Sequence, residues 1–463
     1  MKRVLILSTT TGYQTRSFDA AALALGVELV YGLDQCRGLE NPWVGHSVPV
    51  RFYDDPRSLH ALARANAESP LHGVLALGDR PTVLASEVAE AFGLSFHPPD
   101  AARVSRNKLL TRQRLQHAHL PVPAFAAVPV DADPQALLRE AFPESRIRLA
   151  PTKPRASAVG EVGNPESRLV SFPVVVKPLV LSGSRGVIRA NTPDQFVESV
   201  HRLRHILDAP DVRLMKDPDS RTILIESFIE GREYAVEGLM TEGRLRWLAI
   251  FDKPDPLDGP FFEETIYVTP SRAPAAHQSR IVEAVAAAAR ALGLRHGPVH
   301  AECRVNAGGV FVLEAAARPI GGLCARALRF AAAGGATVSF EELLLRHALG
   351  EAVDTVSRED GASGVMMIPI PTTGVYRGVD GIEAARGVPR IDDLLITAVP
   401  GQHLVTLPDG ASYLGFIFAR GATSADVVAA LRAAHARVRF RIDRELLLAG
   451  SGVAPAARHV RDY

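Results

Sequence analysis

Two glutamates on neighbouring short strands are the residues of this chain best suited to chemistry. They lie in the stretch HAECRVNAGGVFVLEAAARPIGG, which starts at His300. Its alternating apolar pattern predicts strands at 300–305 and 310–314, joined by Asn-Ala-Gly-Gly, a sequence typical of a β-hairpin. Glu302 lies on the first strand and Glu314 on the second.

The register of this hairpin decides whether the two carboxylates can act together. A symmetric connection that pairs Val305 with Val310 would turn them to opposite faces, because Glu302 would then lie opposite Leu313. A three-residue loop with a glycine in the left-handed region shifts the pairing by one residue. Glu302 then faces Glu314 directly, and this is the arrangement we expect.

A pair of glutamates opposed on a sheet requires a counter-charge, because like charges repel there. A hard divalent cation supplies one, and Mg²⁺ typically takes one or two carboxylates together with phosphate oxygens. Glu302 and Glu314 are therefore candidate metal ligands. The alternative is an amphipathic hairpin whose glutamates face water.

A lysine at the end of a predicted strand is a second candidate. Lys177 ends the run VVVK, and the small-residue segment SGSRGV follows from Ser182. Glycines let backbone N–H groups approach phosphate oxygens, and an ammonium adds positive charge. The GxxxxGK[ST] pattern is absent, so this is not a Walker loop. A plain glycine–serine turn is the alternative.

The segment ILIESFIEGREY, residues 223–234, leads an apolar strand into a short hinge with acidic residues at both ends. Such a hinge can hold a purine by backbone hydrogen bonds between apolar walls, while an acid accepts hydrogen bonds from ribose hydroxyls. An ordinary exposed connection between strands is the alternative.

The elements that must position these residues fit an α/β protein. Strands and helices alternate over the first hundred residues, which predicts a doubly wound parallel sheet. The predicted elements of this region are strands 2–8, 27–32 and 73–78 and helices 18–25, 56–68 and 80–92. The loop TTTG after the first strand is not GxGxxG, so a nucleotide site there is only weakly indicated.

The rest of the chain mixes strands and helices less regularly. A short basic helix is expected within 101–124, ended by Pro121, and a flexible surface insertion at 145–171. Later elements are predicted as strands 172–177, 187–190, 222–226 and 233–240 and helices 194–207, 281–292, 340–349 and 424–438, with short strands recurring from residue 364.

Composition narrows the class of protein. A length of 463 residues suffices for about three domains. The formal net charge of +1 argues against a nucleic-acid or membrane-surface protein. Three cysteines without a pairing pattern indicate a reducing compartment and no structural zinc. Neither a signal peptide nor a membrane span is apparent. We expect a cytoplasmic enzyme.

The order of these motifs resembles the ATP-grasp superfamily over about 105–330. Within it, the stretches GPVHAECRVNAGGVFVLEAAARPIGGLCARALRF and FDKPDPLDGPFFEETIYVTPSR are similar to carboxylate–amine ligases of the L-amino-acid ligase type. The resemblance implies an ATP-grasp fold with a Rossmann-like N-terminal domain at 1–104, an ATP-grasp domain at 105–350 with a lid at about 172–240, and a small C-terminal α+β domain at 351–463.

The resemblance also implies which residues bind ATP and metal. They contact the phosphates, form the lid loop, line the adenine pocket or bind the ribose, and they are Lys108, Lys177, Ser182, Gly183, Ser184, Gly186, Val187, Glu226, Phe228, Ile229 and Glu233. Glu302 and Glu314 would hold one or two Mg²⁺ ions, and Mn²⁺ would also suit them. The superfamily often has an asparagine where this chain has Ala316, which puts the second ion in doubt.

Three further residues are implied at the reacting end. Arg318 would bind the carboxylate being activated and the developing phosphate charge. His300 shares a strand face with Glu302 and could reach an acyl phosphate, although a core histidine is an equal alternative. Lys253 could add charge at the γ-phosphate, and the nearby Glu263 or Glu264 could meet a substrate ammonium.

The implied activity is ATP-dependent ligation of a carboxylate to an amine through an acyl phosphate, which joins L-amino acids or an amino acid and a related carboxylate. The alternatives are a biotin-carboxylase-like or purine-pathway ligase on the same scaffold, and a nucleotide-binding protein without chemistry. No nucleic-acid or membrane partner is expected. The two substrates stay open, as does the oligomeric state, for which a homodimer is one option.

Overall fold

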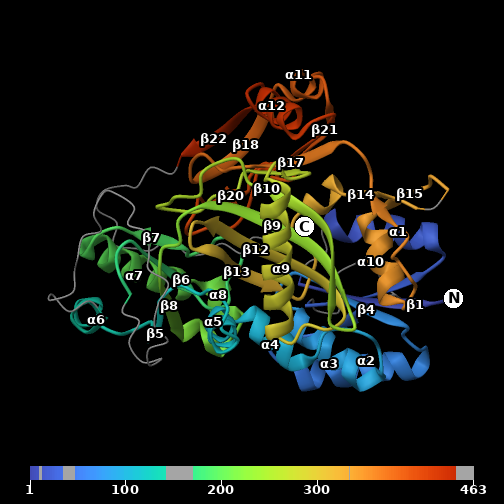
Figure 1. The fold of residues 1–463 in the computed structure, drawn as a ribbon, viewed down its shortest axis with the longest axis horizontal. Helices are drawn as coiled ribbons and strands as arrows, with labels where there is room; N and C mark the ends of the chain where they lie inside the picture. Colours follow the sequence, from blue (N-terminus) through green and yellow to red (C-terminus); the bar gives the residue numbers. More distant parts are fainter. Residues whose placement is uncertain (10–12, 35–46, 142–169, 333, 445–463) are drawn as a thin grey trace.

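The computed structural model describes residues 1–9, 13–34, 47–141, 170–332 and 334–444 of the chain. The surface insertion expected at 145–171 lies outside the described residues, apart from its last two. Figure 1 shows the described residues gathered around one large central sheet, with a smaller sheet at each of two flanks. Among them, no helix has both the length and the apolar character needed to cross a bilayer.

The N-terminal region is a four-stranded parallel sheet in the order β3-β2-β1-β4. Val4 and Ile6 of β1 pack on one face with α1 and α10, while Leu5 and Leu7 pack on the other with α2 and α3. Both faces are thus covered by helices, which confirms the doubly wound fold. The elements are β1 (Arg3–Ser8), α1 (Tyr13–Leu25), β2 (Glu28–Leu33), β3 (Ser47–Pro49), α2 (Asp55–Glu68), β4 (Gly73–Leu77), α3 (Thr82–Phe92) and α10 (Phe340–Ala348).

The helix expected within 101–124 is two helices, α4 (Pro99–Arg106) and α5 (Lys108–His117). They are separated by Asn107, whose backbone is extended and whose side chain accepts hydrogen bonds from the N–H groups of Leu109 and Leu110. An asparagine in this role begins a new helix. The cap therefore fixes Lys108 at the first position of α5.

A second, antiparallel sheet has the order β5-β8-β6-β7 and packs against α7. Valine and isoleucine side chains of its strands form a core with one face of that helix. The elements of this region are β5 (Phe125–Pro129), α6 (Pro134–Ala141), β6 (Val174–Pro178), β7 (Ile188–Ala190), α7 (Pro193–Leu207), α8 (Pro210–Leu214), η2 (Pro218–Arg221) and β8 (Thr222–Ser227).

The central sheet has eight antiparallel strands in the order β13-β12-β9-β10-β11-β17-β21-β19. Its strands are β9 (Arg232–Thr241), β10 (Arg244–Asp252), β11 (Ile266–Thr269), β12 (Gly297–Asn306), β13 (Gly309–Ala316), β17 (Ala362–Ile368), β19 (Ile391–Ile396) and β21 (Gly415–Gly421). The pairing of β11 with β17 carries this sheet across the domain boundary expected at residue 350. Strands from the C-terminal region therefore extend the sheet that holds the glutamate hairpin.

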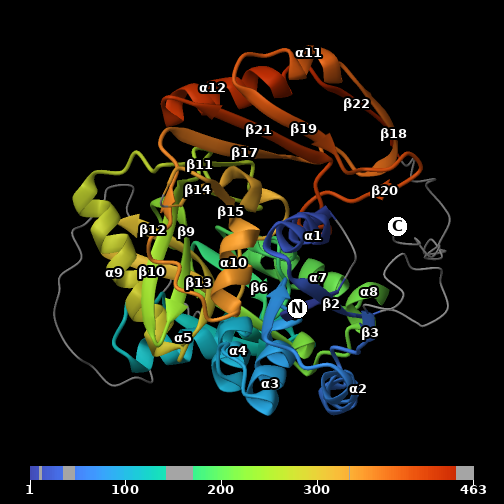
Figure 2. The ribbon, with the colours of Figure 1, turned by 90° about the vertical axis from the view of Figure 1, so that its right-hand side faces the viewer.

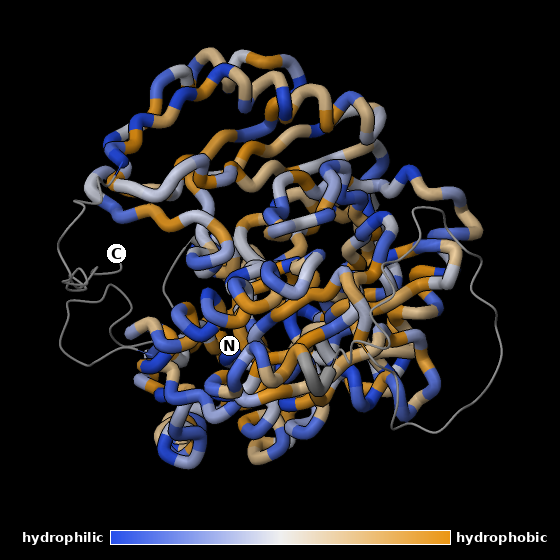
Figure 3. The backbone as a smooth tube through the Cα atoms, turned by 90° about the vertical axis from the view of Figure 1, so that its left-hand side faces the viewer, coloured by the Kyte–Doolittle hydropathy of each residue, from blue (hydrophilic) through white to orange (hydrophobic). Residues whose placement is uncertain are grey.

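Helices cover this sheet at both ends. In α9 (Ala275–Ala291), Ile281, Val285 and Ala288 recur at intervals of four and three and are fully buried, so one face of the helix packs on the hairpin end. At the other end, α11 (Ile382–Arg386) and α12 (Ser424–His435) lie over β17, β19 and β21 (Figure 2). Figure 3 shows hydrophobic residues running along the strands between these layers. The remaining elements are η3 (Cys324–Ala327), β14 (Arg329–Ala331), β15 (Thr337–Ser339), β16 (Ser357–Arg358), β18 (Gly374–Asp380), β20 (His403–Leu404) and β22 (Arg439–Arg444).

Three histidines lie together where the N-terminal sheet meets the central sheet. The rings of His296 and His347 stack with centroids 4.2 Å apart, and His347 Nε2 is 2.9 Å from the hydroxyl of Thr241. His97 accepts a hydrogen bond from the Arg295 N–H and lies 3.0 Å from the Pro298 carbonyl. Burial lowers the pKa of His97 to about 4 and that of His347 to about 3, so both rings are neutral at pH 7.

The low pKa values of His97 and His347 predict that the fold loses stability in mild acid. In the unfolded chain these two histidines titrate near the ordinary pKa of 6.5, so the unfolded state binds more protons as the pH falls below that value. Each of the two should lower the free energy of unfolding by on the order of 1–2 kcal/mol between pH 7 and pH 5. Thermal unfolding at a series of pH values measures this effect.

The variant His347→Gln should show a shallower dependence of melting temperature on pH than the wild type. His277→Gln, at an exposed position of α9, is the matched control and should leave the dependence unchanged. An unaltered pH dependence in His347→Gln would contradict the assignment.

Candidate active site

A cavity of about 590 Å³ lies where the N-terminal sheet, the sheet β5-β8-β6-β7 and the central sheet meet. It opens beside the carboxyl ends of β1 and β4, which is the switch point of the parallel sheet and the usual ligand position in such folds. All residues predicted to bind ATP, metal or substrate line this cavity except Gly186, Lys253 and Glu263. Residues from 14 to 416 of the chain contribute to its wall.

Glu302 and Glu314 pair as predicted, but the hairpin connection differs from the predicted one. Glu302 is opposite Glu314, yet the connection is the symmetric one, with Val305 opposite Val310. The shift occurs further along, where Cys303 pairs with Val312 and Leu313 is the extra residue of a β-bulge. The expectation of a three-residue loop was therefore wrong, and the bulge alone turns both carboxylates to the same side.

Glu302 lines the cavity and is held by three groups around it. Its Oε1 accepts hydrogen bonds from Lys253 at 2.9 Å and from the Tyr267 hydroxyl at 3.0 Å, and His300 Nε2 is 3.5 Å away. Burial opposes ionisation of Glu302, but Lys253 and His300 outweigh it and hold its pKa well below the usual range. Glu302 is therefore an anion with a fixed orientation.

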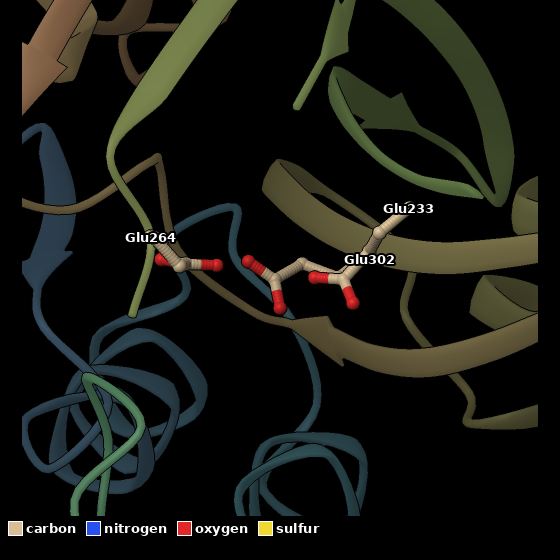
Figure 4. A group of neighbouring side chains, drawn as sticks. All are labelled: Glu233, Glu264 and Glu302. Atoms are coloured by element: carbon tan, nitrogen blue, oxygen red, sulfur yellow. The ribbon is translucent and has the colours of Figure 1, made fainter. Parts of the chain in front are cut away.

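Lys253 lies among three carboxylates. Its ammonium donates to Glu233 at 2.7 Å, to Glu302 and to Glu264. Figure 4 shows these carboxylates turned toward a common space, and their oxygens lie within 4.8 Å of one another. Burial would lower the pKa of Lys253, but the three acids raise it well above the ordinary value. Lys253 thus neutralises the acids and does not itself face the cavity.

Glu264 carries the least compensated charge of that group. Burial and the nearby Glu302 raise its pKa to about 7, with Lys253 partly offsetting them. Glu264 lines the cavity, whereas Glu263 does not. Of the two acids considered for a substrate ammonium, Glu264 is the one in position.

His300 is paired with a buried acid that sequence reasoning missed. Its Nδ1 forms an ion pair with Glu237, which is fully buried and lies opposite it on β9. Burial would lower the pKa of His300, but Glu237 outweighs it and raises the value to about 9, so the ring is cationic at pH 7. The available signal was a glutamate within the otherwise apolar strand AVEGLM.

Arg318 faces the same cavity from the segment after β13. Its Nε donates to Asp79 at 2.6 Å and its Nη2 at 3.1 Å, while Glu314 is 3.7 Å from Nη2. Asp79 follows β4 in the N-terminal sheet and was not predicted. An acid at the carboxyl end of a parallel strand is the signal that could have indicated it.

Two lysines line the cavity near the small-residue loop. Lys108 donates to the Leu181 carbonyl at 2.8 Å, and Lys177 lies 2.5 Å from Glu226. Burial lowers the pKa of Lys177 to about 8, with Glu226 partly offsetting the effect. The small-residue loop follows Lys177, and in it Gly183, Ser184 and Gly186 have φ values of +63°, +56° and +74°. Such left-handed values favour glycine, and a residue without a Cβ lets the backbone lie close to a ligand.

Glu226 is engaged by a second cation, Arg112, which sequence reasoning also missed. Arg112 is fully buried, donates Nε to Glu226 at 2.6 Å and Nη1 to the Val312 carbonyl at 3.3 Å. It therefore ties α5 to β8 and to the glutamate hairpin. Its spacing of four residues from Lys108 places both on one face of α5, which was the available signal.

The far end of the cavity is an apolar slot. Val175, Leu257 and Phe262 form a small cluster of their own, completed by Val187 and Phe228. Phe228 and Phe262 are stacked with centroids 6.3 Å apart. At the edge of the slot, Arg304 donates to the Ile229 carbonyl at 2.7 Å and to Glu233 at 2.9 Å. The slot is therefore apolar, with the Glu233 carboxylate at its edge.

Comparison with protein families gives two matches. An ATP-grasp domain matches residues 170–327, and an L-amino acid ligase C-terminal domain (type 2) matches residues 366–443. The crystal structure of an L-amino acid ligase from Bacillus licheniformis superposes with a TM-score of 0.76, covering 96% of this chain and 99% of that one at 24% identity. The fold is thus that of ATP-grasp proteins.

Two relatives in sequence match this chain over part of their own length. The ATP-grasp enzyme fsqD of Aspergillus fumigatus is 25% identical over 62% of this chain and 46% of its own length. Carnosine synthase 1 of Gallus gallus is 29% identical over 55% of this chain and 26% of its own. The chain thus spans less than half the length of these two relatives.

Arg112 offers a test of how the site is held together. Removing a buried partner of an ion pair typically costs about 3–5 kcal/mol. We therefore expect Arg112→Met to lower the free energy of unfolding by several kcal/mol, measured by denaturant titration. Arg114→Met on the same helix breaks an exposed pair with Asp100 and should cost about 0.5 kcal/mol or less. Equal losses in the two variants would show that burial of this pair is unimportant.

Proposed function

Because the chain belongs to the ATP-grasp superfamily and carries the C-terminal domain of L-amino acid ligases, we propose that it is an ATP-dependent carboxylate–amine ligase. A carboxylate oxygen attacks the γ-phosphorus of ATP, and ADP leaves. An amine then attacks the acyl carbon, phosphate leaves, and an amide remains. One observation carries the proposal: two glutamates opposed across a hairpin lie in one cavity with Lys177 and Arg318.

ATP fits the cavity in one direction. Its adenine occupies the apolar slot beside Phe228, where the backbone of the hinge offers hydrogen bonds. Its ribose meets Glu233, and its phosphates extend toward Lys108 and Lys177 under the small-residue loop. The support for this placement is that an apolar cluster, an acid and two cations line a single cavity.

Glu302 and Glu314 fit a magnesium ion bound with the nucleotide. Both offer hard carboxylate oxygens on the same side of the hairpin, and their mutual repulsion falls when a cation lies between them. When bound, Mg²⁺ supplies positive charge to the phosphate oxygens. With Ala316 in place of an amide ligand, a second ion would depend on phosphate and water for its remaining ligands. Mn²⁺ would suit the same oxygens.

The chain's own cations stabilise the charge that develops during transfer. Arg318 binds the substrate carboxylate, and the cationic ring of His300 adds a second positive charge beside Glu302. Glu264 receives the ammonium of the amine substrate. No side chain is needed as a covalent nucleophile, because positioning and electrostatic stabilisation suffice for phosphoryl transfer.

The substrates we propose are amino acids or closely related small molecules. At the end of the cavity remote from the slot, Met367, Tyr413 and Phe416 contribute an apolar wall from the C-terminal strands and loops. That wall would receive the side chain of the substrate whose carboxylate meets Arg318. Buried free thiols at Cys303 and Cys324 suit a reducing compartment, which we propose is the cytoplasm.

Phosphate release measured across pairs of the twenty amino acids, with ATP and Mg²⁺, tests the proposal, and mass analysis identifies the product. For an active pair, Glu314→Gln should lower kcat by about 10²–10³ while the melting temperature is retained. Glu242→Gln, at an exposed turn, is the control and should behave as wild type. Wild-type turnover by Glu314→Gln would refute the assignment of that residue.

Removal of divalent metal gives an independent test. Because the half-buried carboxylates of Glu302 and Glu314 would face the phosphates, we expect a chelator to abolish release of ADP, and Mg²⁺ or Mn²⁺ to restore it. Full activity in excess chelator would rule out a metal-dependent site.

A further inference from the structure

The segment that carries Arg318 has little structure of its own. β13 ends at Ala316, and the residues up to the 3₁₀ helix η3 form neither helix nor strand. Gly322 adopts a φ of +61° within this segment. A guanidinium on such a segment keeps a defined direction only if other parts of the chain hold it.

The N-terminal sheet provides that hold at two points. Asp79, just after β4, accepts from Nε and Nη2 of Arg318 in a bidentate arrangement. Gln14, at the start of α1, donates its side-chain amide to the Gly322 carbonyl at 2.5 Å. Both residues line the cavity. The irregular segment is thus fixed at its side chain and at its backbone from the same neighbouring sheet.

Glu314 cannot substitute for Asp79. It is 3.7 Å from Nη2, beyond a hydrogen bond, and it is one of the two carboxylates suited to the metal. Asp79 is the carboxylate that bonds to Arg318 directly without belonging to that pair. Arg318 makes three hydrogen bonds within the described residues, two to Asp79 and one from Nη1 to the Pro319 carbonyl. A guanidinium has five N–H groups, so two stay available for a ligand.

We propose that Asp79 is a positioning residue for catalysis, which aims the remaining N–H groups of Arg318 at the substrate carboxylate and the transferred phosphoryl group. This inference rests on the proposed function, because it assigns Asp79 a task only through Arg318. It makes the N-terminal sheet part of the active site, although that sheet contributes no residue of its own to the reacting atoms.

Charge and burial agree with this assignment. Burial opposes ionisation of Asp79, but Arg318 outweighs it and lowers the pKa of Asp79. Asp79 is therefore an anion near neutral pH and a poor proton acceptor, which excludes a role as general base. A planar guanidinium gripped on one edge by a carboxylate has a fixed opposite edge.

The test compares Asp79→Asn, Asp79→Glu and Arg318→Lys, and the double variant of Asp79→Asn with Arg318→Lys, in the ligation assay. Displacing a catalytic group by about 1 Å can cost 10²-fold in rate, so Asp79→Asn should lower kcat by about that factor. KM for ATP should change by less than about threefold, because the nucleotide contacts lie elsewhere. Asp79→Glu, which keeps the carboxylate, should recover part of the loss.

The double variant distinguishes positioning from general weakening of the fold. With Arg318 already replaced, Asp79→Asn should add less than about a threefold loss in kcat. A further loss of about 10²-fold in kcat in the double variant, or a wild-type kcat in Asp79→Asn alone, would overturn the proposal. Asp34→Asn is the matched control: Asp34 follows β2 in the same sheet, pairs with Arg51 and Arg80, and lies outside the cavity lining. It should retain wild-type kcat.

Melting temperatures of the same variants separate this inference from the proposed function. If Asp79 holds Arg318, the double variant should lose less melting temperature than the two single variants lose together, whatever reaction the enzyme performs. Non-additive losses of melting temperature, without turnover of any amino-acid pair, would support the contact and reject the ligase. Additive losses of melting temperature would reject the role of Asp79 even in an active ligase.

Discussion

Buried ion pairs between elements distant in sequence determine the shape of this cavity. Arg112 joins α5 to Glu226 of β8, and His300 of β12 joins Glu237 of β9. Lys253 gathers acids from three segments. A buried charge without its partner costs several kcal/mol, so each pair constrains where the elements around it can lie. The result is an arrangement in which every charged group has one favourable orientation.

The same pairs explain how strong negative charge is tolerated before a ligand binds. Glu302 and Glu264 lie close enough to repel each other, and the Lys253 ammonium, which bonds to both, offsets that repulsion. Both carboxylates line the cavity, whereas Lys253 does not. Lys108 and Lys177 line the same cavity and suit the phosphates of the nucleotide that we propose. A site with acids and cations held in this way suits an anionic ligand that carries a divalent cation.

Local sequence patterns predicted much of the fold, and their failures have physical causes. The alternation of strands and helices predicted the N-terminal sheet, because apolar periodicity is a local property. The break at Asn107 was missed, since a cap interrupts a helix without altering the apolar pattern. Glu302 and Glu314 were correctly expected to face each other, but a β-bulge, and not the predicted three-residue loop, brings this about. A bulge at Leu313 depends on how two strands pair, which spacing alone does not reveal.

The residues that sequence reasoning missed share one property. Asp79 and Glu237 act through partners far along the chain: Arg318 is 239 residues from Asp79, and His300 is 63 residues from Glu237. A single acidic residue in a strand or after it looks the same whether its partner is water or a buried arginine. Phe228 and Ile229 were easier to predict as cavity residues, because the hinge motif is contiguous. Sequence therefore indicated the groups that line the cavity better than the groups that hold them.

The central claim is that the carboxylates of Glu302 and Glu314 converge on one divalent cation. Anomalous diffraction from crystals grown with Mn²⁺ and a non-hydrolysable ATP analogue would test it most directly. The account predicts a manganese peak bonded to oxygens of both glutamates, with Lys253 still among Glu233, Glu264 and Glu302. A peak held by Glu233 and Glu264 without Glu314, or side chains of Glu302 and Glu314 turned to opposite faces of the hairpin, would contradict it.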